Sequence, residues 1–185
     1  MSTTTQDVAV HTYSIDPSHS RMGFTVRHLG FSKVRGAFEQ FEGSVQLNPA
    51  DLSTLVTEGS VQTASITTNE PKRDEHLRSA DFFEAETHPT LSFKSTGVTN
   101  VSGNSFTLTG DLTMRGVTRS VAFAGEYLGE GGDPWGGTRV GLEATTSISR
   151  KEFGIDFNIP VDGADKLMIG DKITINIVAE AVLQA

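Results

Sequence analysis

The strongest constraint on the fold is a two-residue periodicity, which is clearest over residues 106–114. Apolar residues and Gly110 hold the even positions of this run, and polar residues hold the odd ones. Because successive side chains of a strand point to opposite faces of a sheet, the alternation predicts a strand with one buried face. Arg115 and Gly116 predict a tight turn, and residues 117–127 then return as the second strand of an antiparallel hairpin.

Similar runs predict further strands along the rest of the chain. They cover residues 22–28, 34–41, 43–47, 59–67, 91–95, 140–148 and 172–182. About eight or more short strands joined by tight turns are typical of a closed up-and-down barrel or of a sandwich. Closure is favoured because a closed barrel has no exposed edge strand that could aggregate. The glycine-rich run 129–137, which holds the single tryptophan, is predicted to be a loop.

A charged segment interrupts this β pattern. Residues 71–79 are rich in charged side chains, are compatible with a helix, and are followed by Phe82 and Phe83. Asn69 is expected to cap the helix and Pro71 to lie in its first turn. A lone charged helix that ends in paired aromatic residues is a candidate lid or mouth over the interior of a barrel.

Composition excludes several classes of protein. The 185 residues suit a single domain, predicted to span residues 12–185 after a flexible tail of residues 1–11. The net charge of −8, without a basic stripe, argues against nucleic acid as a partner. The absence of cysteine excludes disulfides and thiolate chemistry. No apolar run approaches the roughly 18–20 residues needed to span a bilayer. The first residues also lack the pattern of a signal peptide, so we expect a cytoplasmic protein without a transmembrane segment.

The histidines form no recognisable metal motif. His11, His19, His28, His76 and His88 show none of the short spacings that bind zinc, so no metal site and no cofactor are predicted. A G-x-S-x-G nucleophile motif is absent as well. A histidine beside a carboxylate could still act as an acid or base. A small hydrolase or isomerase that acts on an apolar substrate through His76 or His28 is therefore the alternative to a binding protein.

The candidate binding residues fall into two groups. Those expected at a mouth shared by the helix and the 129–137 loop, where basic groups could hold an anionic head group, are His28, Arg73, His76, Arg78, Phe82 and Trp135. Those expected to face the interior are Phe24, Phe38, Phe93, Phe106, Leu108, Leu112, Met114 and Phe123. The interior side chains either line a tunnel or fill the barrel. A filled barrel would indicate an interaction module rather than a ligand container.

Several segments carry a more specific signal. They are residues 13–16 with 18–20, 26–30 with 34–38, 72–83, 109–113 with 116–118, 133–136 and 149–154. The strongest is 72–83, which is similar to the motif R-D-x-H-L-R-S-x-D-F. Taken together and in this order, the segments resemble the YceI-like family of lipocalin-like, polyisoprenoid-binding proteins from about residue 13 to residue 182.

The resemblance implies an extended eight-stranded antiparallel lipocalin-like β-barrel with a short helix near residues 71–79. It also implies a long apolar channel that binds an isoprenoid lipid with a polyprenyl or quinone-type chain, for transport or storage rather than for catalysis. Dimers are common in such proteins, so a homodimer is a further expectation. The identity and head group of the ligand do not follow from the resemblance.

Overall fold

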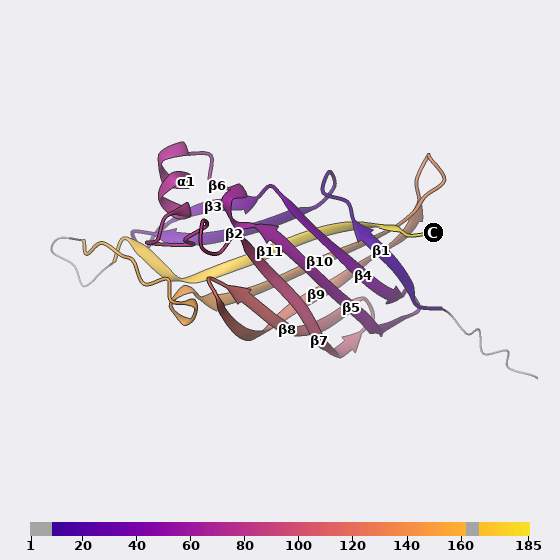
Figure 1. The fold of residues 1–185 in the computed structure, drawn as a ribbon. Helices are drawn as coiled ribbons and strands as arrows, with labels where there is room; N and C mark the ends of the chain where they lie inside the picture. Colours follow the sequence, from indigo (N-terminus) through magenta and orange to yellow (C-terminus); the bar gives the residue numbers. More distant parts are fainter. Residues whose placement is uncertain (1–8, 162–166) are drawn as a thin grey trace, which may run out of the picture.

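The computed structural model describes residues 9–161 and 167–185 and consists almost wholly of antiparallel strands (Figure 1). The helical elements of this part of the chain are α1 (Pro71–Arg78) and two short 3₁₀ turns, η1 (Thr63–Ser65) and η2 (Arg150–Phe153). The strands are β1 (His11–Ile15), β2 (Arg21–His28), β3 (Ser32–Phe38), β4 (Phe41–Asn48), β5 (Asp51–Gln62), β6 (Ile66–Thr67), β7 (Thr90–Ser102), β8 (Ser105–Met114), β9 (Val117–Gly132), β10 (Thr138–Ser149) and β11 (Ile169–Leu183). Residues 1–8 of the predicted tail lie outside the described residues, and β1 already begins at the last position of that tail.

The 11 strands close into an eight-stranded up-and-down barrel, because six of them act as three interrupted strands. β1 continues into β2, β3 into β4 and β5 into β6, each after a short break. Each long strand is hydrogen-bonded to the next one along the chain, and β11 closes the ring by pairing with both β1 and β2. The predicted eight-stranded antiparallel barrel is confirmed, and the sandwich is excluded.

The three breaks lie side by side in the barrel wall. Residues 16–20, residues 39–40 and η1 interrupt three neighbouring strands at the same level. Across the breaks, the backbone nitrogen of Glu39 donates to the carbonyl of Ser65 at 3.1 Å, and that of Gln62 donates to the carbonyl of Gln40 at 2.8 Å. The continuous strand predicted for residues 59–67 is therefore wrong, because the chain turns at η1 before it rejoins the sheet as β6.

The predicted hairpin is confirmed. β8 and β9 pair in register from Ser105 opposite Glu126 to Met114 opposite Val117. The turn between them has φ values of 51° at Arg115 and 72° at Gly116, the left-handed values that a type I′ turn requires. β9 runs on to Gly132, so the loop predicted for residues 129–137 is confined to residues 133–137.

The charged segment forms α1, but with a different N-cap from the one predicted. Asn69 lies outside the helix with a φ of 60°, so the chain is still turning at this position. Glu70 is the N-cap instead, and its carboxylate accepts a hydrogen bond from the backbone nitrogen of Arg73 at 2.6 Å. Pro71 lies in the first turn, as predicted.

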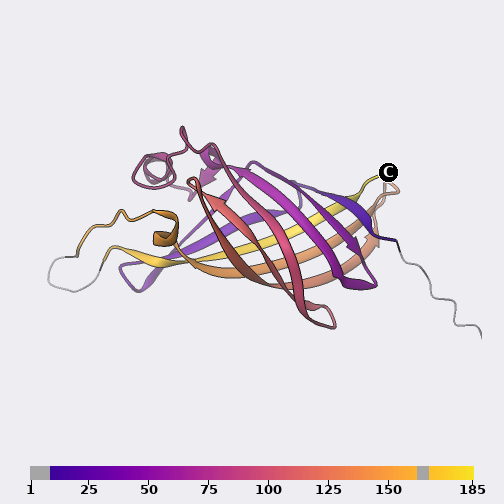
Figure 2. The same ribbon diagram turned by 60° about the horizontal axis from the view of Figure 1, so that its bottom comes forward.

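The helix and the β9–β10 hairpin lie at opposite ends of the barrel (Figures 1 and 2). β9 is 16 residues long, and a strand rises about 3.3 Å per residue. It therefore carries the chain from the turn beside the helix to the far end. The expectation that the helix and the tryptophan loop share one mouth is wrong for this reason.

At this far end, Arg139 of β10 gathers three carboxylates from separate parts of the chain. Its Nη1 lies 2.7 Å from Asp16 Oδ2 and 2.6 Å from Glu180 Oε1, and its Nε lies 2.8 Å from Asp133 Oδ2. Hydrogen bonds from Ser18, Arg139 and other donors hold the pKa of Asp16 well below its ordinary value of 3.8. The cluster therefore fastens β10, β11 and the segment after β1 together as long as the carboxylates are ionised.

We expect Arg139→Gln to lower the melting temperature by a few degrees at neutral pH, because three carboxylates lose their shared cation. The pKa of Asp16 is lower in the folded chain than in the unfolded one. The stability from its ionised form is therefore fully present above about pH 4 and is lost as the pH falls through the folded-state pKa. Thermal unfolding followed by circular dichroism should show that the difference in melting temperature between parent and variant becomes smaller in acid.

The matched control is Arg119→Gln on β9, because Arg119 is exposed and donates to the carbonyl of its neighbour Thr118 at 3.5 Å. This variant should melt close to the parent at every pH. A gap for Arg139→Gln that stays constant from neutral to acidic pH would contradict the stated role of the cluster.

Candidate ligand-binding cavity

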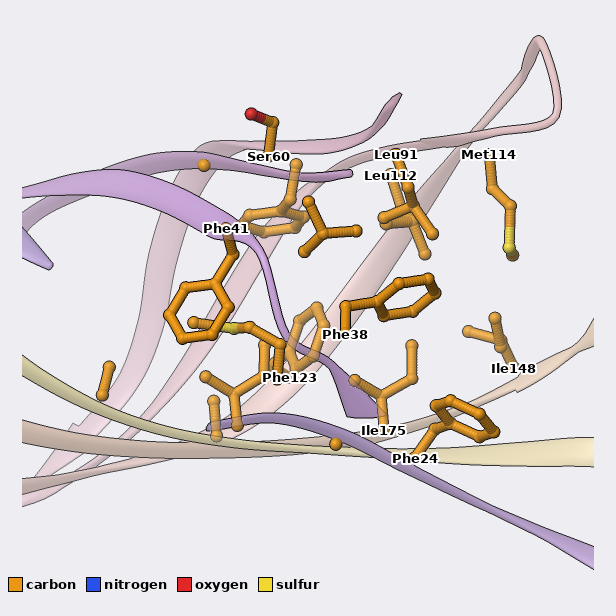
Figure 3. Close-up of a pocket in the computed structure, with 18 of the residues that line it drawn as sticks. Phe24, Phe38, Phe41, Ser60, Leu91, Leu112, Met114, Phe123, Ile148 and Ile175 are labelled. Atoms are coloured by element: carbon orange, nitrogen blue, oxygen red, sulfur yellow. The ribbon is translucent and has the colours of Figure 1, made fainter. Parts of the chain in front are cut away.

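The barrel encloses a cavity of about 250 Å³ with an almost wholly apolar wall (Figure 3). Alternate residues of each strand point inward, so nearly every strand contributes side chains. The predicted binding residues that the structure brings together in this wall are Phe24, Phe38, Phe82, Phe93, Phe106, Leu108, Leu112, Met114 and Phe123. Their participation in ligand binding stays a prediction. Eight of them were expected to face the interior, whereas Phe82 was expected at the mouth and lies in the same wall.

Side chains around the cavity are half-buried although they lie inside the barrel. Phe24, Phe41 and Ile175 are examples, and Figure 3 shows these three side chains around the cavity. A side chain in a filled core would be surrounded by other atoms and would expose almost nothing. These three residues border open space, so the barrel is hollow in this region.

The far end of the barrel is filled instead. Tyr13, Leu47 and Val140 belong to a packed cluster there and are at most 1% exposed. The hydroxyl of Tyr13 donates to Glu130 at 2.9 Å, and burial raises the pKa of this phenol, which therefore stays neutral. The cavity is closed on this side and extends toward α1.

Three phenylalanine rings in the wall lie against glycines of a neighbouring strand. Phe24 covers Gly36, Phe93 covers Gly110 and Phe106 covers Gly125, and each ring occupies the position that a Cβ on the glycine would take. Because the glycine has no side chain, the ring can lie along the wall instead of reaching across the interior. This packing lets large aromatic residues cover the wall while the centre remains open.

The charged residues of α1 attach the helix to the barrel. Arg73 donates to Oγ1 and to the carbonyl of Thr68, at 2.7 and 3.0 Å, and Arg78 donates to carbonyls of η1 and β6 at 2.7 and 3.0 Å. The buried carboxylate of Asp74 accepts from the backbone and hydroxyl of Thr68. Leu77 is the residue of α1 that belongs to the cavity wall.

The histidines proposed as acid or base lie outside the wall. His76 is exposed, and its Nε2 lies 2.7 Å from Asp81 Oδ2. Its ring contacts Phe82 and Phe157 edge-on, with centroid distances of 5.0 and 4.9 Å. His28 ends β2 and is not among the wall residues either.

Five predicted binding residues are thus not gathered at the cavity: His28, Arg73, His76, Arg78 and Trp135. The position of Trp135 differs most from the predicted one, because Trp135 is 83% exposed and lies in the β9–β10 loop at the end opposite α1 (Figure 1). A role for any of the five in binding stays a prediction.

Sequence reasoning also missed part of the wall. The residues concerned include Leu77, Phe83, Leu91, Arg150, Ile173, Ile175 and Ile177. The three isoleucines occupy alternate positions of one predicted strand, so the same periodicity could have identified them. Nothing local marks Arg150 as an interior residue, because arginine is rarely buried.

Asp16, His19 and Glu180 come together at the far end, with potential metal-ligand atoms within 4.8 Å of one another. The Arg139 guanidinium already neutralises two of them. We therefore assign no metal to this cluster.

The helix in the described part of the chain is too short and too polar to cross a bilayer.

Comparison with known proteins agrees with this architecture. A model of the YceI-like domain family matches residues 13–181. A UPF0312 protein of Photorhabdus laumondii is 42% identical over 164 residues, which cover 86% of this chain and 81% of the relative.

Two solved structures share the fold. BcnA of Burkholderia cenocepacia superimposes with a TM-score of 0.78 at 20% identity, covering 90% of this chain and 99% of BcnA. A polyisoprenoid binding domain from Saccharophagus degradans superimposes with a TM-score of 0.67 at 12% identity, covering 93% of this chain and 98% of that domain.

We expect Gly125→Ala to destabilise the barrel, because the added Cβ collides with the Phe106 ring. The ring must then move into the cavity or strain the wall, and overpacking of this kind costs about 1–3 kcal/mol. Urea unfolding measures the change. Gly97→Ala on β7 is the control, because a Cβ there meets no atom within 4 Å.

The double variant Gly125→Ala with Phe106→Leu separates this collision from a general effect of alanine. The smaller leucine makes room for the Cβ. The free energy of unfolding should therefore fall by less in the double variant than the sum of its decreases in the two single variants. Strictly additive losses would show that the ring and the glycine do not depend on each other.

Proposed function

The chain belongs to the family of YceI-like domains, and from this premise we propose that it binds an isoprenoid lipid, whose apolar chain lies in the barrel cavity. The observation that carries the proposal is the cavity itself, which is apolar, hollow toward α1 and closed at the far end. The shared fold of the polyisoprenoid binding domain from Saccharophagus degradans supports the same class of ligand. Binding would serve transport or storage of the lipid.

The energetics favour a long chain over a short one. Burial contributes about 0.8 kcal/mol per apolar carbon, so one five-carbon isoprene unit is worth about 4 kcal/mol. Association costs about 4–15 kcal/mol in lost freedom. Several isoprene units must therefore be buried before binding becomes tight, which selects polyprenyl or quinone-type chains over single isoprenoid units.

The alternative functions fit the structure less well. A hydrolase or isomerase that used His76 or His28 would need that ring beside its substrate, and neither histidine belongs to the cavity wall. An interaction module would need a filled barrel, whereas several interior side chains border open space. The cytoplasmic location and the homodimer stay predictions.

Native mass spectrometry of the purified protein, followed by organic extraction, tests the proposal. We expect a stoichiometric isoprenoid in the extract, or its uptake when the protein is incubated with polyprenyl lipids and quinones. A mass that matches the bare chain before and after such incubation would refute the proposed function.

We expect Ile175→Trp to reduce lipid uptake strongly, because the larger side chain fills part of the cavity that Ile175 borders (Figure 3). Val178→Trp is the matched control, since Val178 lies on the same strand but is 41% exposed on the outer face. Both variants are compared with the parent by native mass spectrometry after circular dichroism has shown that they fold. Equal uptake by the two variants would place the lipid outside the cavity.

A further inference from the structure

The β2–β3 hairpin carries a stripe of positive charge in a chain that is acidic as a whole. The net charge of the chain is −8, yet no acidic residue occurs between Asp16 and Glu39. The arginines and the lysine of this stretch are all exposed. They form the basic stripe, which consists of Arg21, Arg27, Lys33 and Arg35.

Strand alternation places the basic stripe on the outer face of the barrel. The even-numbered residues of β2 from Met22 to Val26 belong to the cavity wall, so its odd-numbered residues face outward. Cross-strand partners share a face, and Arg27 is the partner of Lys33. Arg35 lies two positions further along β3 and therefore faces outward as well. The expectation that the chain lacks a basic stripe is wrong, because these residues share a face only once β2 and β3 have paired.

The positive charges of the stripe are not matched by carboxylates. Within residues 9–161 and 167–185, no member of the stripe forms an ion pair, whereas Arg139 binds three carboxylates. Arg27 and Lys33 also lie directly opposite each other, and like charges in this position are destabilising. An anion supplied from outside the molecule would relieve this repulsion.

The stripe leads to an exposed apolar tip at the end of the barrel that carries α1 (Figures 1 and 2). Phe31, in the turn between β2 and β3, is 73% exposed. Ile159 and Leu167 are exposed nearby, because the backbone nitrogen of Leu29 donates to the carbonyl of Met168 at 2.8 Å and that of Met168 donates to the carbonyl of Ile159 at 3.0 Å. Exposed apolar side chains that gather at one place indicate a contact with a partner or a membrane.

This tip adjoins the end of the cavity toward α1. Ile169 belongs to the cavity wall and is the cross-strand partner of His28, which ends β2 just before the turn. The opposite end of the barrel is filled by packed side chains. A lipid that enters or leaves the cavity at the end toward α1 would therefore pass close to Phe31.

We propose that the β2–β3 hairpin is a docking surface for an anionic lipid bilayer. Arg27 and Lys33, which flank the turn, contact the lipid phosphates, and Phe31 inserts among the acyl chains. The charge of the stripe is complementary to such a bilayer, whereas the rest of the chain is acidic and is repelled by it, so the barrel docks with its α1 end toward the membrane. This inference rests on the proposed function and deepens it, because it gives the surface from which the isoprenoid lipid is exchanged.

Flotation with lipid vesicles tests the docking directly. The probes are vesicles of phosphatidylcholine alone and of phosphatidylcholine with added phosphatidylglycerol. We expect the parent to bind the anionic vesicles far better than the neutral ones, and to bind them less as the salt concentration rises. Arg27→Gln with Lys33→Gln should weaken binding about 25-fold, since each basic side chain near an anionic surface is worth about fivefold in affinity.

The matched control removes the same charge on the other side of the barrel. Lys94→Gln with Arg119→Gln changes exposed residues of β7 and β9, and neither strand is a neighbour of β2 or β3. This variant should bind the anionic vesicles within about twofold of the parent, because charges more than a Debye length from the bilayer are screened. Equal weakening by both double variants would mean that net charge alone decides and would overturn the proposal. Equal binding of the parent to both kinds of vesicle, or to neither, would overturn it as well.

The single tryptophan of the chain allows a test of orientation. Trp135 lies in the loop at the far end, so its emission in the parent should not change when anionic vesicles are added. Phe31→Trp combined with Trp135→Phe moves the only tryptophan to the hairpin tip, and its emission should then shift to shorter wavelength. A shift in the parent without one in this variant would mean that the opposite end docks, and would refute the proposal.

Other occupants of the stripe would give different results. Binding of a DNA duplex that is lost in the Arg27→Gln, Lys33→Gln variant, or a dimer that becomes a monomer in it, would overturn the proposal if the parent binds no vesicles. Polyprenyl lipid delivered in detergent should be taken up equally by the parent and this variant, because no cavity residue is changed. Failure of both to take up lipid would refute the proposed function, whereas flotation alone decides whether the hairpin docks.

Discussion

A phenylalanine ring can cover the inner wall of a narrow barrel only where the strand beside it leaves room. Glycines supply that room here, because the rings of Phe24, Phe93 and Phe106 each take the space that a Cβ on a neighbouring glycine would fill. Aromatic rings bury a large apolar area, and in these positions they do so along the wall rather than across the centre. The cavity depends on this packing, and the proposed lipid binding depends on the cavity. A wall with larger residues at the glycine positions would have to turn its rings inward and would become a filled barrel.

The two ends of the barrel are stabilised by different means. At the far end, buried apolar side chains and the carboxylate cluster around Arg139 hold the strands together. At the other end, α1 covers the cavity and is held by hydrogen bonds from Arg73 and Arg78 to neighbouring backbone. Basic residues that the sequence suggests for a ligand head group are thus used in part to attach the helix. Arg150, from a different part of the chain, belongs to the cavity wall, but its guanidinium is buried and is held by backbone carbonyls.

Local pattern predicted much of the fold and part of the cavity. The alternation in residues 106–114 identified both the hairpin and its inward-facing side chains, because strand geometry alone decides which face a residue occupies. The predicted N-cap was wrong because Asn69 adopts a left-handed conformation, with a φ of 60°, and Glu70 caps the helix instead. The position of Trp135 was wrong because it depends on the length of β9, which continues beyond the run of clear alternation. The burial of Arg150 could not be predicted, since its carbonyl partners lie in the segment after η2 and in β11 and meet it only when the barrel closes.

The breaks at residues 16–20, residues 39–40 and η1 form a line of interrupted strands on one side of the barrel. Three neighbouring strands are interrupted at one level, whereas β11 runs past the break after β1 and pairs with both β1 and β2. The part of the wall beyond these breaks consists of β2, β3 and β6. The helix α1 is attached to it by hydrogen bonds from Arg73 and Arg78 to backbone carbonyls. If the barrel widens at the end that carries α1, this part of the wall is the one that would move, because its strands are interrupted where they meet β1, β4 and β5, whereas β11 spans both parts.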